Sequence, residues 1–201
     1  MRYSRILEKD VRESEYSPRR AYARLQAMAC KEQCNSVPIA IGGFMGAIFY
    51  SLRMRVDGDL MMPSLPDGYV FADEGATVAV ISLLYVAVRR QVKEVRVCVD
   101  RDKDRLLLSF EGELVSEDAA VAVRRFEEQG EGKGLFSLLR GVAKNSGIGL
   151  TCHTGETFGF SLRFSRSASE IQEVHASDGE QRDRVNDIFI GILPLLGRSI
   201  L

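Results

Sequence analysis

The fold is decided by residues 130–164, which read GEGKGLFSLLRGVAKNSGIGLTCHTGETFGFSLRF. Glycines at every second position from Gly130 to Gly134 remove Cβ atoms, so that backbone N–H groups can close around a phosphate. Apolar residues then recur with a helical period, and Gly147 favours a helix end. The run from Phe158 to Phe164 alternates with a period of two, which predicts a half-buried antiparallel strand.

A glycine-rich turn of this kind is either a phosphate-binding loop or a plain turn, and its surroundings decide the fold class. A dinucleotide-binding fingerprint follows a strand and lies within a βαβ unit. Here the turn follows a helical stretch, Ser116–Arg125, and the helix after it leads into two strands with an antiparallel pattern. A Rossmann domain is therefore disfavoured.

The order of these motifs resembles the histidine-kinase-type ATPase domains of the gyrase, chaperone and histidine-kinase superfamily over roughly residues 37–165. In that family the glycine turn is followed by a helix, a strand and a hairpin ending in Gly-x-Thr-Phe, and Gly155–Phe158 takes that place here. Asp73–Arg90 reads as the helix that carries the family's asparagine box, and Phe110–Gly112 stands where the first glycine box lies. The resemblance implies an α/β fold, a two-layer α/β sandwich preceded by N-terminal helices. We expect a mixed sheet of about five strands under about three helices.

The resemblance also implies a nucleotide site with ATP and Mg²⁺ as its ligands. The residues that it places at this site are Arg89, Gly112, Gly130, Gly132, Gly134, Leu135 and Thr157.

The family's chemical groups are replaced at several of its positions. Val86 stands where an asparagine coordinates Mg²⁺, and valine has no oxygen to offer a hard cation. Ser82 replaces the earlier asparagine of the same box, Phe110 replaces the aspartate that accepts from the adenine amino group, and Leu114 replaces a glycine. The lid is reduced to residues 127–129, whose charge repels phosphates. We therefore expect a degenerate site with no bound cofactor, no metal ligand and no catalytic residue.

Composition sets further limits. The chain has 201 residues, a formal net charge of −1 and a pI of about 6.2, which argues against a nucleic-acid binder. Its first residues are charged and lack the apolar core of a signal peptide. The longest apolar stretch, Val37–Leu52, contains three glycines and is too short to span a membrane. A cytoplasmic location without a membrane span is expected.

The cysteines and histidines form no strong site. Cys30 and Cys34 share a helix face, which fits either two metal ligands or two ordinary thiols, and the absence of nearby further ligands favours thiols. Cys152 and His153 are neighbours on an expected strand and point to opposite faces. Residues 1–36, which correspond to the family's phosphorylated helical hairpin, contain no histidine.

The chain divides into three parts. Residues 1–36 are expected to be helical and to pair with a second copy of the chain, 37–165 form the ATPase-like domain, and 166–201 are a polar linker followed by an apolar tail. Within the tail, Pro194 argues against a long uninterrupted helix. The tail is expected to pack on its own domain, with docking of a partner as the alternative.

Three strands are expected before the glycine turn. Residues 37–52 predict a helix or helix–turn that leads into a first strand at Asp59–Met62. Residues 93–100 and 105–110 predict a hairpin.

These features favour a histidine-kinase-like module of two-component-type signal transduction that acts by contact with a protein partner. The alternative is a functional ATP-binding kinase domain that phosphorylates a protein partner. A small-molecule enzyme has no supporting triad, carboxylate pair or metal cluster in the sequence.

Overall fold

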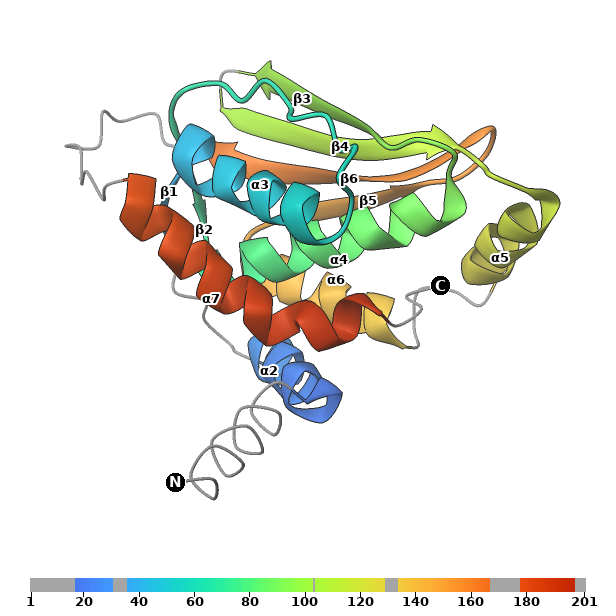
Figure 1. Ribbon diagram of the computed structural model, residues 1–201, viewed down its shortest axis with the longest axis horizontal. Helices are drawn as coiled ribbons and strands as arrows, with labels where there is room; N and C mark the ends of the chain where they lie inside the picture. The colour runs from blue at the N-terminus through green and yellow to red at the C-terminus, as the bar shows by residue number, and fades with distance from the viewer. Residues whose placement is uncertain (1–16, 31–35, 103, 129–133, 167–177, 198–201) are drawn as a thin grey trace, which may run out of the picture.

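The computed structural model describes residues 17–30, 36–102, 104–128, 134–166 and 178–197 (Figure 1). Six strands form one sheet in the order β1-β2-β6-β4-β3, and β5 pairs with β6 on the side that β2 also occupies. Every described strand pair is antiparallel, so the expected mixed sheet is wrong in this respect. The strands are β1 (Val37–Ala40), β2 (Tyr69–Ala72), β3 (Arg96–Asp102), β4 (Arg105–Glu113), β5 (Gly149–His153) and β6 (Thr157–Arg166).

The described helices other than α5 lie on one face of the sheet, and α5 stands apart at the right-hand end of the view (Figure 1). Helices α3, α4 and α6 lie directly under the strands, and α2 and α7 pack against these helices from the far side. The predicted two-layer sandwich is therefore confirmed, with the two terminal helices added beneath it. The helices are α2 (Pro18–Cys30), the π-helical turn η1 (Ile41–Met45), α3 (Gly46–Arg55), α4 (Glu74–Gln91), α5 (Glu117–Glu128), α6 (Leu135–Asn145) and α7 (Asp178–Leu196).

Helix α4 is the centre of the molecule. It begins where the sequence predicts, because the Asp73 carboxylate accepts from the backbone N–H of Ala76 over 2.9 Å and caps the first turn. Every residue from Ala76 to Val88 is buried, since the sheet covers one side of the helix and α7 covers the other. Burial is therefore not confined to one face of this helix. Its whole circumference lies in the core.

The elements that follow the glycine turn fold largely as predicted. Helix α6 ends at Asn145, and Gly147 follows with a φ of 71°, a left-handed conformation that favours glycine. Strand β6 buries Phe158, Phe160 and Phe164 as expected, but Gly159 and Ser161 between them are buried as well, so the strand is more than half-buried. The rings of Phe136 on α6 and Phe160 stack with centroids 5.3 Å apart, which fixes α6 to the sheet.

The strand predicted at Asp59–Met62 is wrong. These residues form a loop in which Leu60 is buried and Met61 is 79% exposed. The loop contains Pro63 and Pro66, and proline cannot donate to a ladder. The first strand of the sheet is instead Val37–Ala40, which pairs with β2.

The C-terminal segment also differs from its prediction. The helix of α7 begins at Asp178, inside the expected linker, and continues through Pro194 to Leu196. Pro194 lies in the last turn, where only the bond to the Ile190 carbonyl is lost. The expectation that the tail packs on its own domain is confirmed, because Phe189 and other apolar residues are buried against α3 and α4.

Of the N-terminal segment 1–36, the structure describes residues 17–30 and residue 36. Pro18–Cys30 is helical, as predicted, and its Leu25 is buried where α2 packs against α6 and α7 of the same chain. The remaining residues of the proposed dimerisation segment lie outside the described ranges.

Candidate functional site

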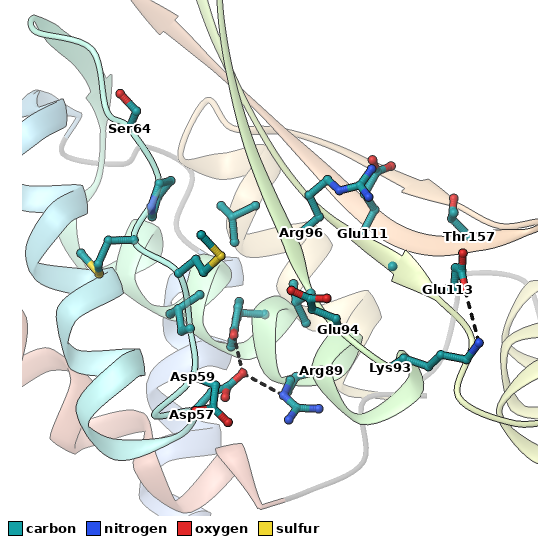
Figure 2. A pocket seen from close by; sticks show the side chains of 18 residues that line it. Asp57, Asp59, Ser64, Arg89, Lys93, Glu94, Arg96, Glu111, Glu113 and Thr157 are labelled. Carbon is teal, nitrogen blue, oxygen red and sulfur yellow. Dashed lines mark hydrogen bonds and ion pairs between the residues drawn. The ribbon is translucent and has the colours of Figure 1, made fainter.

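A cavity of about 930 Å³ opens between the loop after α3, the C-terminal half of α4 and the strands β3 and β4 (Figure 2). Three of the residues that the family resemblance assigns to a nucleotide site line it, namely Arg89, Gly112 and Thr157. Residues from four separate segments of the sequence therefore meet where the resemblance predicts a site.

The rest of the predicted site is not brought to this cavity. Gly134 is the residue before α6, with a φ of 86°, and Leu135 is buried at the start of that helix. Neither lines the cavity. Gly130 and Gly132 lie outside the described residues.

Arg89 is held by an internal carboxylate. Its Nε donates to Asp57 Oδ2 over 2.8 Å, and the hydroxyl of Tyr85 donates to the same oxygen over 2.7 Å. Tyr85 and Arg89 are four residues apart on α4, so they lie on one face of the helix and reach the same acceptor. This cluster ties the loop after α3 to the end of α4.

The cluster shifts the pKa of two of its members. Burial raises the pKa of Asp57, but the hydrogen bonds from Tyr85 and Arg89 and the charge of Arg89 lower it by more, so the pKa lies below its ordinary value. Burial is also the largest cause of the raised pKa of Tyr85, and the hydrogen bond to Asp57 and its negative charge raise it further. The carboxylate is therefore held ionised and the phenol neutral.

Gly112 has a packing role. A Cβ added at this residue would lie 2.2 Å from the carbonyl oxygen of Glu94 and 2.8 Å from Val92 Cγ2. The chain after α4 runs this close because Lys93 N–H donates to the Glu113 carbonyl over 2.9 Å and Val92 forms a bridge with Leu114. The space that glycine leaves at this position is taken up by the protein's own backbone.

The positions of the metal ligand and the adenine acceptor lie in the core. Val86 is 5% exposed and supplies no oxygen, and Ser82 is fully buried with no hydrogen-bond partner for its Oγ among the described residues. Phe110 is fully buried, and its ring packs edge-on against Phe49 and Tyr85 at centroid distances of 6.2 and 6.0 Å. Neither Val86 nor Phe110 carries a side-chain oxygen that could ligate a metal ion or accept a hydrogen bond from an amino group.

The cavity is lined by more acidic than basic side chains. Two of the basic ones, Arg89 and Lys93, are paired with Asp57 and Glu113 at 2.8 and 3.2 Å. The lining carboxylates are Asp57, Asp59, Glu94, Glu111 and Glu113, and the lining cations are Arg89, Lys93 and Arg96.

The sequence did not identify Asp57 or Tyr85 as a pair. The available signal was a tyrosine hydroxyl in the largely apolar helix α4, four residues before an arginine. Such a buried hydroxyl requires an acceptor. An Asp-Gly-Asp turn after the preceding helix offered two candidates, of which the structure selects Asp57.

Other candidate groups remain apart from the cavity. His153 Nε2 lies 2.6 Å from Ser161 Oγ, which is 2.8 Å from Ser109 Oγ, on the sheet face away from the helices. Cys30 is exposed, and Cys34 lies outside the described residues. Within the described ranges, no group of three or more histidine, cysteine or acidic residues is placed to hold a metal ion. The same ranges contain no helix long and apolar enough to cross a membrane.

The fold is that of the ATPase domain of histidine kinases. The structure superposes on Acinetobacter baumannii histidine kinase AdeS with a TM-score of 0.52 and 13% sequence identity, over 72% of this chain and 75% of that one. A structure of full-length ShkA in complex with AMPPNP is matched with a TM-score of 0.48 and 19% identity, over 76% of this chain and 35% of that one. No protein-family model and no curated protein matches the sequence. At these identities the likeness shows the fold alone.

Proposed function

We propose that the chain is a histidine-kinase-like module of two-component-type signal transduction that has lost its nucleotide chemistry and acts by contact with a protein partner in the cytoplasm. The observation that carries this proposal is the burial of Val86 and Phe110. At one position the metal ligand is replaced by an aliphatic side chain, and at the other the adenine acceptor is replaced by a core ring. Nucleotide recognition is thereby removed at both ends of the ligand.

The remaining site residues support the same proposal. Arg89, the cation that stands where a phosphate-contacting lysine lies in the family, is committed to Asp57. Gly112 accommodates the carbonyl of Glu94. Carboxylates outnumber cations around the cavity, and such a lining repels the phosphates of ATP.

The second candidate is a functional ATP-binding kinase domain that phosphorylates a protein partner. The cavity itself favours it, because Arg89, Gly112 and Thr157 gather there as the resemblance implies. Phosphoryl transfer, however, depends on positioning and on metal-assisted neutralisation of charge. A kinase of this kind would need another oxygen ligand in place of the one that Val86 cannot supply.

Calorimetric titration of the full chain with ATP, in the presence and absence of Mg²⁺, separates the two candidates. We expect no saturable heat with either form of the nucleotide. The variant Val86→Asn returns the family's amide to this helix and is expected to leave ATP unbound, because Phe110 is unchanged. A micromolar, metal-dependent dissociation constant that Arg89→Ala weakens would restore the kinase hypothesis.

We also propose that the segment 1–36 pairs two copies of the chain, as the helical hairpin of the resembling family does. Light scattering of the full chain is expected to give the mass of a dimer, and of a variant that lacks residues 1–16 the mass of a monomer. A monomeric full chain at high concentration would contradict this pairing.

A further inference from the structure

We propose that the cavity of Figure 2 receives a short segment of a protein partner that carries lysine or arginine side chains between apolar residues. This inference rests on the proposed function, since it names the chemistry of the partner that a non-catalytic module would contact. The ligand that it assigns to the cavity is positively charged, whereas a nucleotide is negatively charged.

The charge of the lining selects a cation. Arg89 and Lys93 are neutralised by Asp57 and Glu113. Arg96 stands opposite Glu111 in the β3–β4 ladder, and Figure 2 shows their side chains next to each other.

Three lining carboxylates have no ion pair within the described ranges, and only one of them, Glu111, lies opposite a cation in the ladder. Asp59 and Glu94 are exposed, line the cavity from two different segments, and form no ion pair with any residue of the described ranges. A positive side chain that entered the cavity would meet these two carboxylates without displacing an existing partner.

The uncharged part of the lining accommodates the stem of such a side chain. Met61 and Met62 are 79% and 42% exposed, although methionine is an apolar residue. Their unbranched thioethers adapt to different partner shapes. Lysine and arginine bury their methylene stems along apolar surface while the charged head reaches a carboxylate. The exposed methionines would cover such a stem, and the free carboxylates beside them would bind its charged head. Leu60, Val95 and Val97 add further apolar surface.

The size of the cavity favours a segment of a protein over a small ion. At about 930 Å³ it is larger than one side chain needs and lies near the top of the usual range for ligand pockets. A small polyamine would engage Asp59 and Glu94 but leave the methionines uncovered. A segment with alternating basic and apolar residues would contact both the carboxylates and the methionines. Contact with the methionines therefore distinguishes such a segment from a polyamine in an experiment.

The test measures binding of the full chain to a short fluorescein-labelled peptide of alternating Lys and Leu, by fluorescence anisotropy. The reference probe is the same peptide with Glu in place of Lys. We expect the basic peptide to bind and the acidic one not to bind. Neutralising the two free acids in the double variant Asp59→Asn/Glu94→Gln is expected to weaken binding at least about tenfold, and added salt is expected to weaken binding to the wild type.

The matched control is Asp183→Asn/Asp187→Asn, which removes the same charge from exposed residues of α7. It is expected to bind within about twofold of wild type. Labelling the methionine methyl groups with ¹³C gives a second measurement. The signals of Met61 and Met62, assigned from the Met61→Leu and Met62→Leu variants, should move when the peptide is added, and that of the fully buried Met45 should not.

Equal loss of affinity in the two double variants, or unmoved signals of Met61 and Met62, would overturn the inference. Displacement of the peptide by spermidine at equal concentration would also overturn it, because the ligand would then be a free organic cation. ATP is titrated into the same preparation. If neither ATP nor peptide binds, only this inference fails, whereas tight metal-dependent ATP binding refutes the proposed function itself.

Discussion

Arg89 Nε donates to Asp57 Oδ2 over 2.8 Å, and this contact joins the end of α4 to the loop that follows α3. The loop has no ladder or helix of its own between Leu60 and Asp67, yet it forms one wall of the cavity. Its position therefore depends on side-chain contacts, namely the Asp57 cluster with α4 and the packing of Leu60 and Leu65 on the core. The cation that the family resemblance assigns to a phosphate has a structural partner in this chain.

Replacing Asp57 by alanine tests this dependence. The fully buried Tyr85 would lose the acceptor of its hydroxyl, which costs about 1–3 kcal/mol of unfolding free energy. The loss of the ion pair with Arg89 is expected to add little to this cost, because the Arg89 side chain is 41% exposed and can be solvated by water instead. Urea unfolding measures the effect. Asp59→Ala, in the same turn but without an ion pair among the described residues, should stay within about 0.5 kcal/mol of wild type.

The same carboxylate predicts a loss of stability in acid. Because the folded-state pKa of Asp57 is depressed, the unfolded chain takes up its proton first as the pH falls. The stabilisation is therefore complete above the ordinary aspartate pKa of about 3.9 and is lost as the pH falls through the lower folded value. Urea unfolding of wild type and Asp57→Asn from neutral pH to pH 3 should show the difference between them shrinking below about pH 4. A difference that is constant with pH would contradict the depressed pKa.

Tyr85 predicts a loss of stability at high pH, whereas Asp57 predicts one in acid. The folded-state pKa of Tyr85 is raised, so its contribution is complete below the ordinary tyrosine pKa of about 10 and is lost as the pH rises above it. At pH 7 we expect Tyr85→Phe to lower the unfolding free energy by about 0.5–1.5 kcal/mol, the worth of the hydrogen bond to Asp57. Above about pH 10 this deficit should shrink. Tyr22→Phe, on the exposed side of α2, is the control and should follow wild type throughout.

The sequence predicted the elements whose signals are local. An aspartate before an apolar run placed the start of α4, a glycine placed the end of α6, and alternating phenylalanines placed β6. The motif order from Asp73 to Phe158 predicted the fold, which is confirmed. Gly112 and Thr157 were assigned to a site from the same order, and both line the cavity.

The predictions that were wrong or missing concern features that depend on contacts between distant parts of the chain. Residues 59–62 pair with no strand of the described ranges, whereas Val37–Ala40 forms a strand because β2 lies beside it. Helix α7 tolerates Pro194 because its apolar residues are buried against α3 and α4, and burial outweighs one lost hydrogen bond. The Asp57 cluster joins residues about thirty positions apart, a separation at which no periodicity gives a signal.

Phe110 should act as a core residue. It is fully buried on β4 between Phe49 and Tyr85, and removing such a ring leaves a cavity that costs about 3–5 kcal/mol. Phe110→Ala is therefore expected to lower the midpoint of urea unfolding strongly. Leu107→Ala is the matched control, because this residue lies on the same strand, points to the opposite face and is 37% exposed. Equal effects of the two substitutions would contradict the assignment of Phe110 to the core.

Gly112 should tolerate no side chain, and the reason is distance. The Cβ of an alanine would lie 2.2 Å from the Glu94 carbonyl oxygen, which is backbone and cannot turn away. The segment after α4 must then move off β4, and overpacking of this kind costs about 1–3 kcal/mol. Gly42→Ala is the control, since no heavy atom lies within 4 Å of its added Cβ and alanine favours a helical turn. Thermal and urea unfolding should show Gly112→Ala destabilised and Gly42→Ala at or slightly above wild type. Wild-type stability of Gly112→Ala would mean that the backbone of Glu94 does not occupy this space, and the nucleotide hypothesis would regain the room it needs.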